Sequence, residues 1–193
     1  MNLNAIVSQA VGAVNPLSPI SVQVSTGSQR NADTSRTPQF ASLAQFTGSI
    51  AGRVLTVSSV ASGALAVGQA VIGIGVSPAT LITHQIDGTP GGVGDYQLTT
   101  TPNLASSSLQ CVAGAMGQIQ NLTYRDLQQL EGLNIQGVRH AVYINGRVDG
   151  IIRSQNKGGD LITFSDGTTW LIAHVLEYWP TWCKVAATLQ NGS

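Results

Sequence analysis

The side chains best suited to chemistry in this sequence are three scattered histidines. His84, His140 and His174 stand in three different contexts, and none has a partner at the spacing of a metal site or a catalytic triad. The G-x-S-x-G, H-E-x-x-H and P-loop motifs are also missing from the sequence. We therefore expect structural histidines, with no catalytic, cofactor-binding or metal-binding residue.

Glycines and acidic residues are the next candidates for chemistry. Gly91, Gly92 and Gly94 could cradle a phosphate, but neither a helix nor a lysine follows them, so a β-turn is the better interpretation. An acid pair would have to come from these residues: Asp149, Asp160, Asp166 and Glu177. Three of the four adjoin turn glycines. We expect a protein that is not an enzyme and needs no cofactor.

The composition favours assembly over catalysis. The chain has 193 residues, enough for one ordinary domain or two small ones, and we predict two. Only 9% of the residues are charged, against about 25% in average soluble proteins. The formal net charge is zero, so no long-range field attracts nucleic acid or an anionic membrane, and near-neutrality favours association.

Targeting signals and cysteines suggest cytosolic synthesis. No apolar run is long enough for a membrane-spanning helix, and no basic residue precedes the apolar part of the N-terminus as in a secretory signal. We expect no membrane partner. Cys111 and Cys183 lie far apart without ligand spacing, so we expect two buried free thiols, with a disulfide as the alternative.

The last third of the chain, residues 138–191, alternates apolar residues with sharp turns. Asn145-Gly146 and Asp166-Gly167 accept positive φ and predict tight connections. Before the first turn stand Val142 and Ile144; after it we expect a strand with Val148 and Ile151-Ile152, bent at Gly150. Pro180 bends the chain before a closing strand. Four or five short antiparallel strands predict a small barrel or sandwich.

An amphipathic segment opens the chain. Its apolar residues fall at helical spacing and include Leu3, Ile6, Val7, Val11 and Val14. This predicts a short helix that ends at Pro16, docked either on its own domain or against a neighbouring subunit. A strand over 17–25 and a polar surface loop over 26–38 follow.

A second helix is predicted after Thr123. Thr123 and Asp126 have the spacing of a reciprocal N-terminal cap, with Asp in place of Glu or Gln. Leu127 and Leu130 are expected to supply its core contacts, and Gly132 to stop it.

The composition changes sharply between residues 47 and 115. Only Arg53, Asp87 and Asp95 are charged there, against twelve charged residues in 116–193. Short apolar strands separated by glycine turns predict a small β-sandwich. We interpret 47–115 as a domain inserted into a discontinuous domain of 1–46 and 116–193, with Gly48 and Gly114–Gly117 as flexible hinges.

Two stretches resemble known virion proteins. The pattern L-x-V-x-x-V-x-S-G-x-L-x-V-G-Q-x-V-x-G-x-G-V with a later G-G-x-G-x-Y-x-L resembles a module of tailed-bacteriophage structural proteins and some bacterial surface proteins. It is carried by Leu55, Val57, Val60, Ser62, Gly63, Leu65, Val67, Gly68, Gln69, Gly73, Gly75, Gly92, Gly94, Tyr96 and Leu98. The run DGTTWLIAHVLEYWPTWCKVAATL resembles the closing strands of phage head-completion and connector proteins.

The resemblances imply a mainly β fold, in which a small antiparallel β-barrel carries an inserted immunoglobulin-like sandwich. They imply a non-enzymatic virion protein, made in the bacterial cytoplasm, that forms a ring in the phage neck. That ring would be six- or twelve-fold, beside other neck, portal or tail proteins and packaged DNA. A tail-tip, baseplate or capsid-decorating protein is the alternative; a sugar-binding or enzymatic tail protein is a third hypothesis.

Two residue sets are candidate contact sites. Tyr178, Trp179 and Trp182 surround Pro180 and belong either to the core or, with the N-terminal stripe, to a subunit interface. Four basic residues could face a DNA-filled channel or form an ordinary solvated strand face: Arg139, Arg147, Arg153 and Lys157.

Overall fold

The computed structural model describes residues 16–131, 137, 139–146, 148–151 and 157–190, and within them the chain is mainly β, as predicted. The strands are β1 (Ser18–Gln23), β2 (Ser25–Arg30), β3 (Arg36–Phe40), β4 (Ala44–Ala51), β5 (Val54–Gly63), β6 (Ala70–Ile72), β7 (Thr80–Gln85), β8 (Gly94–Leu98), β9 (Leu104–Gln120), β10 (Arg139–Asn145), β11 (Leu161–Phe164), β12 (Thr169–Tyr178) and β13 (Cys183–Gln190). One helix, α2 (Tyr124–Leu130), lies between β9 and β10. The predicted N-terminal helix lies outside the described residues.

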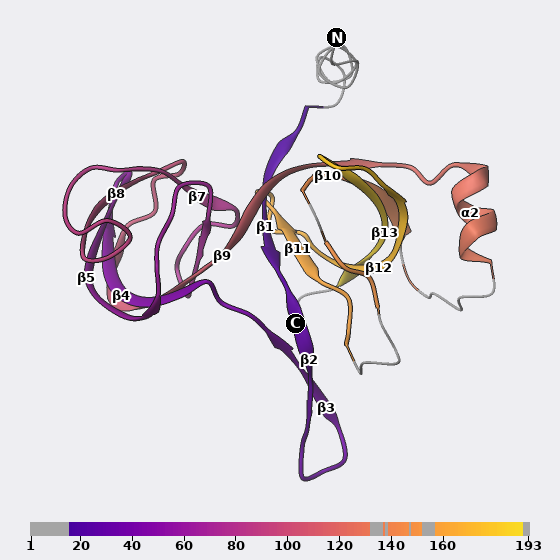
Figure 1. Cartoon of the computed structure of the whole chain (residues 1–193), viewed down its shortest axis with the longest axis horizontal. Coiled ribbons are helices and arrows are strands. Elements are labelled where there is room, and N and C mark those ends of the chain that lie inside the picture. Colours follow the sequence, from indigo (N-terminus) through magenta and orange to yellow (C-terminus); the bar gives the residue numbers. More distant parts are fainter. Residues whose placement is uncertain (1–15, 132–136, 138, 147, 152–156, 191–193) are drawn as a thin grey trace.

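Two lobes and a projecting hairpin make up the molecule (Figure 1). In the central lobe, β4, β5, β8, β7 and β6 pair in that order, and both β4 and β6 pair with β9. In the C-terminal lobe, β1, β11, β12, β13 and β10 pair in that order, and both β1 and β10 pair with β9. Each set of pairings therefore returns to the same strand. The central lobe does not divide into the two separate sheets that the predicted sandwich requires.

Each lobe has its own hydrophobic core. The central core runs in sequence from Ala44 to Cys111 and includes Phe46, Leu55 and Tyr96. The C-terminal core takes Ile20 and Val22 from β1, and its other buried residues come from positions after 141. The cores thus separate near residues 44 and 112, three residues before each predicted domain boundary. Whether residues 47–115 fold as an independent insertion stays a prediction.

The predicted glycine hinges are wrong, because these glycines lie inside paired strands. Gly48 pairs with Val57 in β5, and Gly114 to Gly117 pair with β1. A Cβ on Gly48 would lie 2.8 Å from the carbonyl oxygen of Thr56, and one on Gly114 would collide with the carbonyl oxygen of Gly68. These positions need glycine for close backbone approach, not for flexibility.

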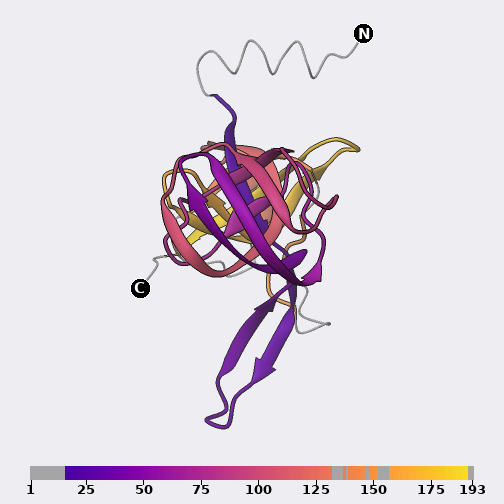
Figure 2. The same cartoon turned by 90° about the vertical axis from the view of Figure 1, so that its left-hand side faces the viewer.

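The predicted polar loop over 26–38 is instead a β-hairpin. Strands β2 and β3 pair from Ser25 opposite Phe40 to Arg30 opposite Arg36. The hairpin extends away from both lobes (Figures 1 and 2). At its tip, the side-chain Nδ2 of Asn31 donates to the hydroxyls of Ser35 and Thr37. An alternation of apolar and polar residues indicates a strand only where one face of the strand is buried. Both faces of this hairpin are largely exposed, so its sequence lacks that alternation and resembles a loop.

The connections in the C-terminal lobe are partly as predicted. The Asp166-Gly167 turn joins β11 to β12, and a bend at Pro180 joins β12 to β13, where the Trp179 amide donates to the Trp182 carbonyl at 2.9 Å. The strand expected after Asn145-Gly146 is wrong for residues 148–151, which form no strand; Ile152 lies outside the described residues. Both edges of β10 are already paired, with β9 and β13, so the following segment has no free edge there.

Candidate interaction surfaces

Helix α2 is fixed to the outer face of the C-terminal lobe at its first turn. The predicted cap at Thr123 is confirmed, since its hydroxyl accepts from the Asp126 amide while the Asp126 carboxylate accepts from the Thr123 amide. Leu130 is buried as expected. Leu127 is 46% exposed, so its predicted core contact is wrong. Leu130 and Asp126 are thus the two buried residues of the helix.

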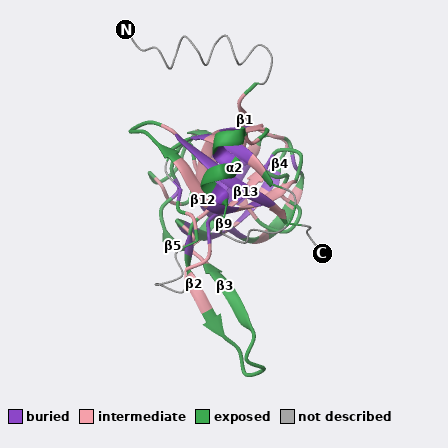
Figure 3. Cartoon of the chain, turned by 90° about the vertical axis from the view of Figure 1, so that its right-hand side faces the viewer, coloured by how far each residue is buried: buried purple, intermediate pink, exposed green. Residues whose placement is uncertain are grey.

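Asp126 forms a buried ion pair with Lys184 of β13. The Lys184 ammonium lies 2.7 Å from both carboxylate oxygens, and both residues are buried. Figure 3 shows α2 on the side of the lobe where β13 lies. Burial acts to raise the pKa of Asp126, but hydrogen bonds from Lys184 and Thr123 outweigh it and lower this pKa. Burial acts to lower the pKa of Lys184, and hydrogen bonds to Asp126 and Tyr143 outweigh it and raise this pKa.

An aromatic stack continues from this ion pair toward the surface. The Lys184 ammonium lies 5.5 Å from the centre of the Tyr143 ring, a cation–π contact. Tyr143 stacks on Trp182 at 5.8 Å between ring centres, and Trp182 on Trp179 at 5.9 Å with 17° between their planes. We call Tyr143, Trp182 and Trp179 the aromatic stack.

The sequence left open whether Tyr178, Trp179 and Trp182 belong to the core or to a subunit interface, and the exposure of their rings bears on this choice. Trp179 is 53% exposed and Tyr178 48% exposed, so neither belongs to the core. Trp182 is half-buried between its two stacking partners. Tyr143 was missed by the sequence analysis, because it comes from another strand and only the pairing of β10 with β13 brings it beside Lys184. The outer ring, Trp179, therefore lies at the surface of the lobe, and its role in a subunit interface stays a prediction.

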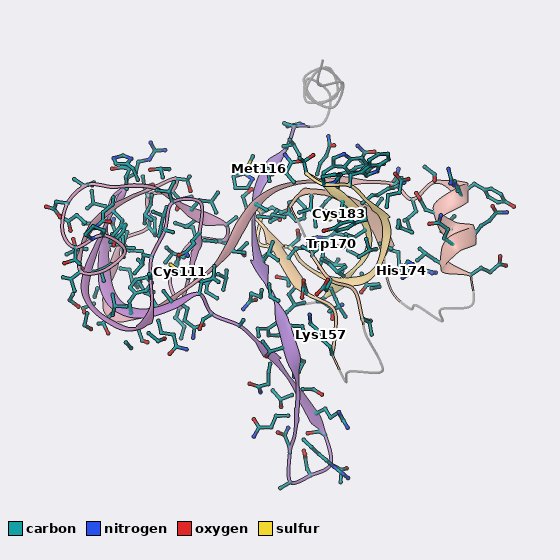
Figure 4. The ribbon with its side chains drawn as sticks, viewed as in Figure 1. Cys111, Met116, Lys157, Trp170, His174 and Cys183 are labelled. Atoms are coloured by element: carbon teal, nitrogen blue, oxygen red, sulfur yellow. The ribbon has the colours of Figure 1, made fainter. Side chains whose placement is uncertain are left out.

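A second buried carboxylate fixes the base of the hairpin. Asp160 is 1% exposed, and its two oxygens accept from the amides of Ser25, at 2.8 Å, and Asp149, at 2.7 Å. Burial raises the pKa of Asp160, although both amide hydrogen bonds act to lower it. Lys157 pairs with Asp149 at 2.9 Å beside the same junction, where Figure 4 places it near the base of the hairpin. Asp160 thus has a structural role.

A shallow hollow of about 390 Å³ lies between the hairpin and the segment that carries Lys157. It is lined by Gly27, Ser28, Arg36, Pro38, Ile151, Lys157 and Gly158. Arg36 donates to the Ser28 hydroxyl at 3.2 Å, and Lys157 is engaged by Asp149. Both cations of the hollow are therefore already paired with this chain's own oxygens.

The four predicted channel-facing residues are not brought together by any contact of the described chain. Arg139 is exposed at the start of β10, opposite Thr188, whereas Lys157 is half-buried beside Asp149. Arg147 and Arg153 lie outside the described residues. The channel-facing role stays a prediction.

His140 and the glycine-rich turn have structural contacts. His140 meets the edge of the Trp170 ring at 5.3 Å, and among the described residues no three His, Cys, Asp or Glu side chains form a metal-binding group. The turn prediction for Gly91–Gly94 is confirmed: Gln85 donates to the carbonyls of Asp87 and Thr89 and accepts from the Gly91 amide.

The two cysteines are free and buried, as predicted, and lie in different lobes (Figure 4). Burial raises the pKa of the Cys111 thiol to about 12 and also raises that of Cys183. No helix in the described part of the chain is long and apolar enough to cross a membrane.

Comparisons with known protein families, with characterised proteins and with solved structures find no match for this chain.

Proposed function

We propose that this chain is a non-enzymatic structural protein of a tailed-phage virion. It forms a homo-oligomeric ring in the neck, where it joins or closes the head to the tail. The C-terminal lobe is the assembly domain, and the central lobe projects outward as a decoration. The observation that carries the assembly function is the projecting hairpin β2–β3.

The hairpin lacks a hydrophobic face of its own. In β2 only Ser25 is buried, and in β3 every residue before Phe40 is exposed. An isolated two-stranded hairpin is marginally stable in water, and stability normally comes from a third strand or a packed partner. Asp160 fixes the hairpin's base to the C-terminal lobe, so a subunit that contacted the hairpin would be tied to that lobe. This arrangement suits an arm that reaches a neighbouring subunit.

The strand pairings support the roles of the two lobes. In the C-terminal lobe they return to β9, as in a small closed barrel that leaves no unpaired strand edge between its members. The central lobe is nearly uncharged and carries exposed apolar side chains, including Ile74 at 95%. The resemblance of its sequence to virion modules supports decoration, although its single cycle of pairings differs from an immunoglobulin-like sandwich.

The position in the particle can be tested by labelling the central lobe. The Ile74→Cys variant places a thiol on an exposed loop, whereas the native Cys111 and Cys183 are buried. Virions that carry this variant and are treated with maleimide-gold should show gold at the head–tail joint, and wild-type virions should remain unlabelled. Gold at the tail tip or on the capsid face would favour the alternative, a baseplate or capsid-decorating protein. Purified virions that lack the protein altogether would overturn both.

A further inference from the structure

The projecting hairpin places two arginines directly opposite each other. Arg30 of β2 and Arg36 of β3 are register partners, and both are exposed. Directly opposite side chains lie on the same face of an antiparallel pair, and like charges in that position destabilise the pair. The nearby acid, Asp33, accepts from the amide and the hydroxyl of Ser35 in the turn, and among the described residues Arg30 forms no ion pair. The two arginines therefore favour an anionic partner.

The aromatic stack has an acidic residue at its exposed end. Trp179, the outer ring, is 53% exposed. Glu177 stands two residues earlier, is exposed, and has Lys184 as its register partner. The Lys184 ammonium lies over Tyr143 of the stack, so Glu177 extends from the same face of the sheet. Because Lys184 is held by Asp126, Glu177 forms no ion pair within the part of the chain that the structure describes.

An exposed indole beside a carboxylate is suited to bind arginine. The guanidinium group is planar and always charged, it stacks on aromatic rings, and its N–H groups bind carboxylates in pairs. The hairpin offers two such groups, one for the ring of Trp179 and one for the carboxylate of Glu177. Arginine, tryptophan and tyrosine are also the residues that most often dominate the binding energy of protein interfaces.

The two surfaces lie on opposite sides of the molecule. The hairpin projects on one side, and the bend between β12 and β13, drawn in yellow, lies on the other (Figures 1 and 2). One chain's hairpin therefore does not reach its own stack. The net charge of zero provides no long-range field that would attract a nucleic acid to the hairpin instead. Complementary charges on opposite sides of a neutral chain fit a second copy of the same chain.

We propose that the hairpin of one copy docks on the aromatic stack of the next copy, with Arg30 and Arg36 against Trp179 and Glu177. The docking rests on the proposed role of the hairpin as an arm, and it names the surface that the arm binds. The contact joins two different surfaces, so it repeats head-to-tail from copy to copy. Such a contact closes into a ring when the rotation between neighbours allows it.

Sedimentation of the full chain over a range of concentrations tests this contact. Arg30→Ser with Arg36→Ser removes the hairpin's side of it, and Trp179→Ser removes the stack's side. We expect wild type to self-associate, more weakly at high salt, and each variant to associate at least about tenfold more weakly. Arg53→Ser removes an exposed arginine of the central lobe and should associate like wild type. All of these side chains are exposed, so urea denaturation should show wild-type folding in every variant.

A mixture of the two variants identifies the surfaces. The Trp179→Ser chain keeps an intact hairpin and the double variant keeps an intact stack, so together they should form a one-to-one dimer that does not grow further. Folded variants that stay monomeric in the mixture would overturn the proposal, as would a wild type that stays monomeric at its highest soluble concentration. A monomeric wild type that binds a DNA duplex through Arg30 would instead assign the hairpin to nucleic acid. None of these results depends on where gold labels the particle, so this contact and the neck position fail separately.

Discussion

The two lobes solve the same packing problem with different chemistry. Each pairs its strands in a cycle through β9 around a core of twelve buried residues. In the central lobe the buried side chains are apolar apart from Thr80, whereas the C-terminal lobe buries Asp126, Asp160 and Lys184. Each buried charge of the C-terminal lobe attaches something to it: Asp126 and Lys184 hold α2, and Asp160 holds the hairpin. The buried charges of this lobe therefore attach peripheral elements to it, and they are not part of its hydrophobic core.

Excision of the central lobe is the largest alteration of the chain that we consider. It tests whether the C-terminal core folds without the central core. The Leu43 amide donates to the Cys111 carbonyl at 2.7 Å, so the two ends lie together, and a short Gly-Ser linker can join residue 43 to residue 113. We expect the remaining chain to unfold cooperatively in urea and to keep Cys183 protected from thiol reagents, because the C-terminal core contains no residue from 44–112. A chain that lacks a cooperative transition would show that the lobes depend on each other.

Breaking the buried ion pair should be the most damaging single substitution. Lys184→Ala leaves the Asp126 carboxylate buried without its cation, and we expect a loss of about 3–5 kcal/mol in the free energy of unfolding. The measurement is urea denaturation followed by circular dichroism. The double variant Lys184→Met with Asp126→Asn should recover much of this loss, since it removes both charges. A loss below about 1 kcal/mol in Lys184→Ala would contradict the buried pair.

Two adjacent glycines of the C-terminal lobe allow a matched comparison. One lies in close contact with the backbone of another segment, and the other does not. A Cβ at Gly159 would collide with the carbonyl oxygen of Ile172, whereas one at Gly158 would lie 3.8 Å from the Ser25 hydroxyl, an ordinary contact. We expect Gly159→Ala to cost about 2–3 kcal/mol and Gly158→Ala less than about 1 kcal/mol. Thiol reactivity should rise at Cys183 before Cys111, which would place the damage in one lobe. Equal effects of the two substitutions would argue against the close approach.

The smallest expected effect concerns how folding stability depends on pH. The contributions of the two buried carboxylates, Asp160 and Asp126, should change with pH in opposite directions. Asp160 has a raised pKa, so the folded state binds its proton more tightly and its contribution falls as the pH rises above the ordinary value of 3.8. Asp126 has a lowered pKa, so its contribution is present above 3.8 and is lost as the pH falls below it. Urea denaturation of wild type, Asp160→Asn and Asp126→Asn across acidic pH measures both. The stability advantage of wild type should shrink with rising pH relative to Asp160→Asn and grow relative to Asp126→Asn.

The features that could be predicted from the sequence are local. The Thr123 cap depends on residues three apart, the Asp166-Gly167 turn on a dipeptide, and the Pro180 bend on one residue. Each is decided by backbone preferences that the neighbouring residues alone determine. The two hydrophobic cores separate near residues 44 and 112, close to the composition step at 47 and 115, while the inserted domain itself stays a prediction.

Besides the local hairpin β2–β3, sequence reasoning missed the contacts that join distant parts of the chain. Lys184 and Asp126 lie 58 residues apart, and Asp160 and Ser25 lie 135 apart. No spacing rule links such pairs, because strand order and register bring them together. A sign was present in β13, where Lys184 is the one charged residue of a strand that is otherwise almost wholly buried. Lysine is rarely fully buried without a partner, so its place in that strand indicates an acidic residue packed against it.

Strand β9 also determines how the molecule would respond to force. Its seventeen residues pass without a break from the central lobe, where they pair with β4 and β6, into the C-terminal lobe, where they pair with β1 and β10. A pull between the lobes would load these backbone hydrogen bonds in shear, all at once, and would find no slack linker to extend. We therefore expect the central lobe to act as a lever, so that a push at its far end reaches the strands β1 and β10 through β9.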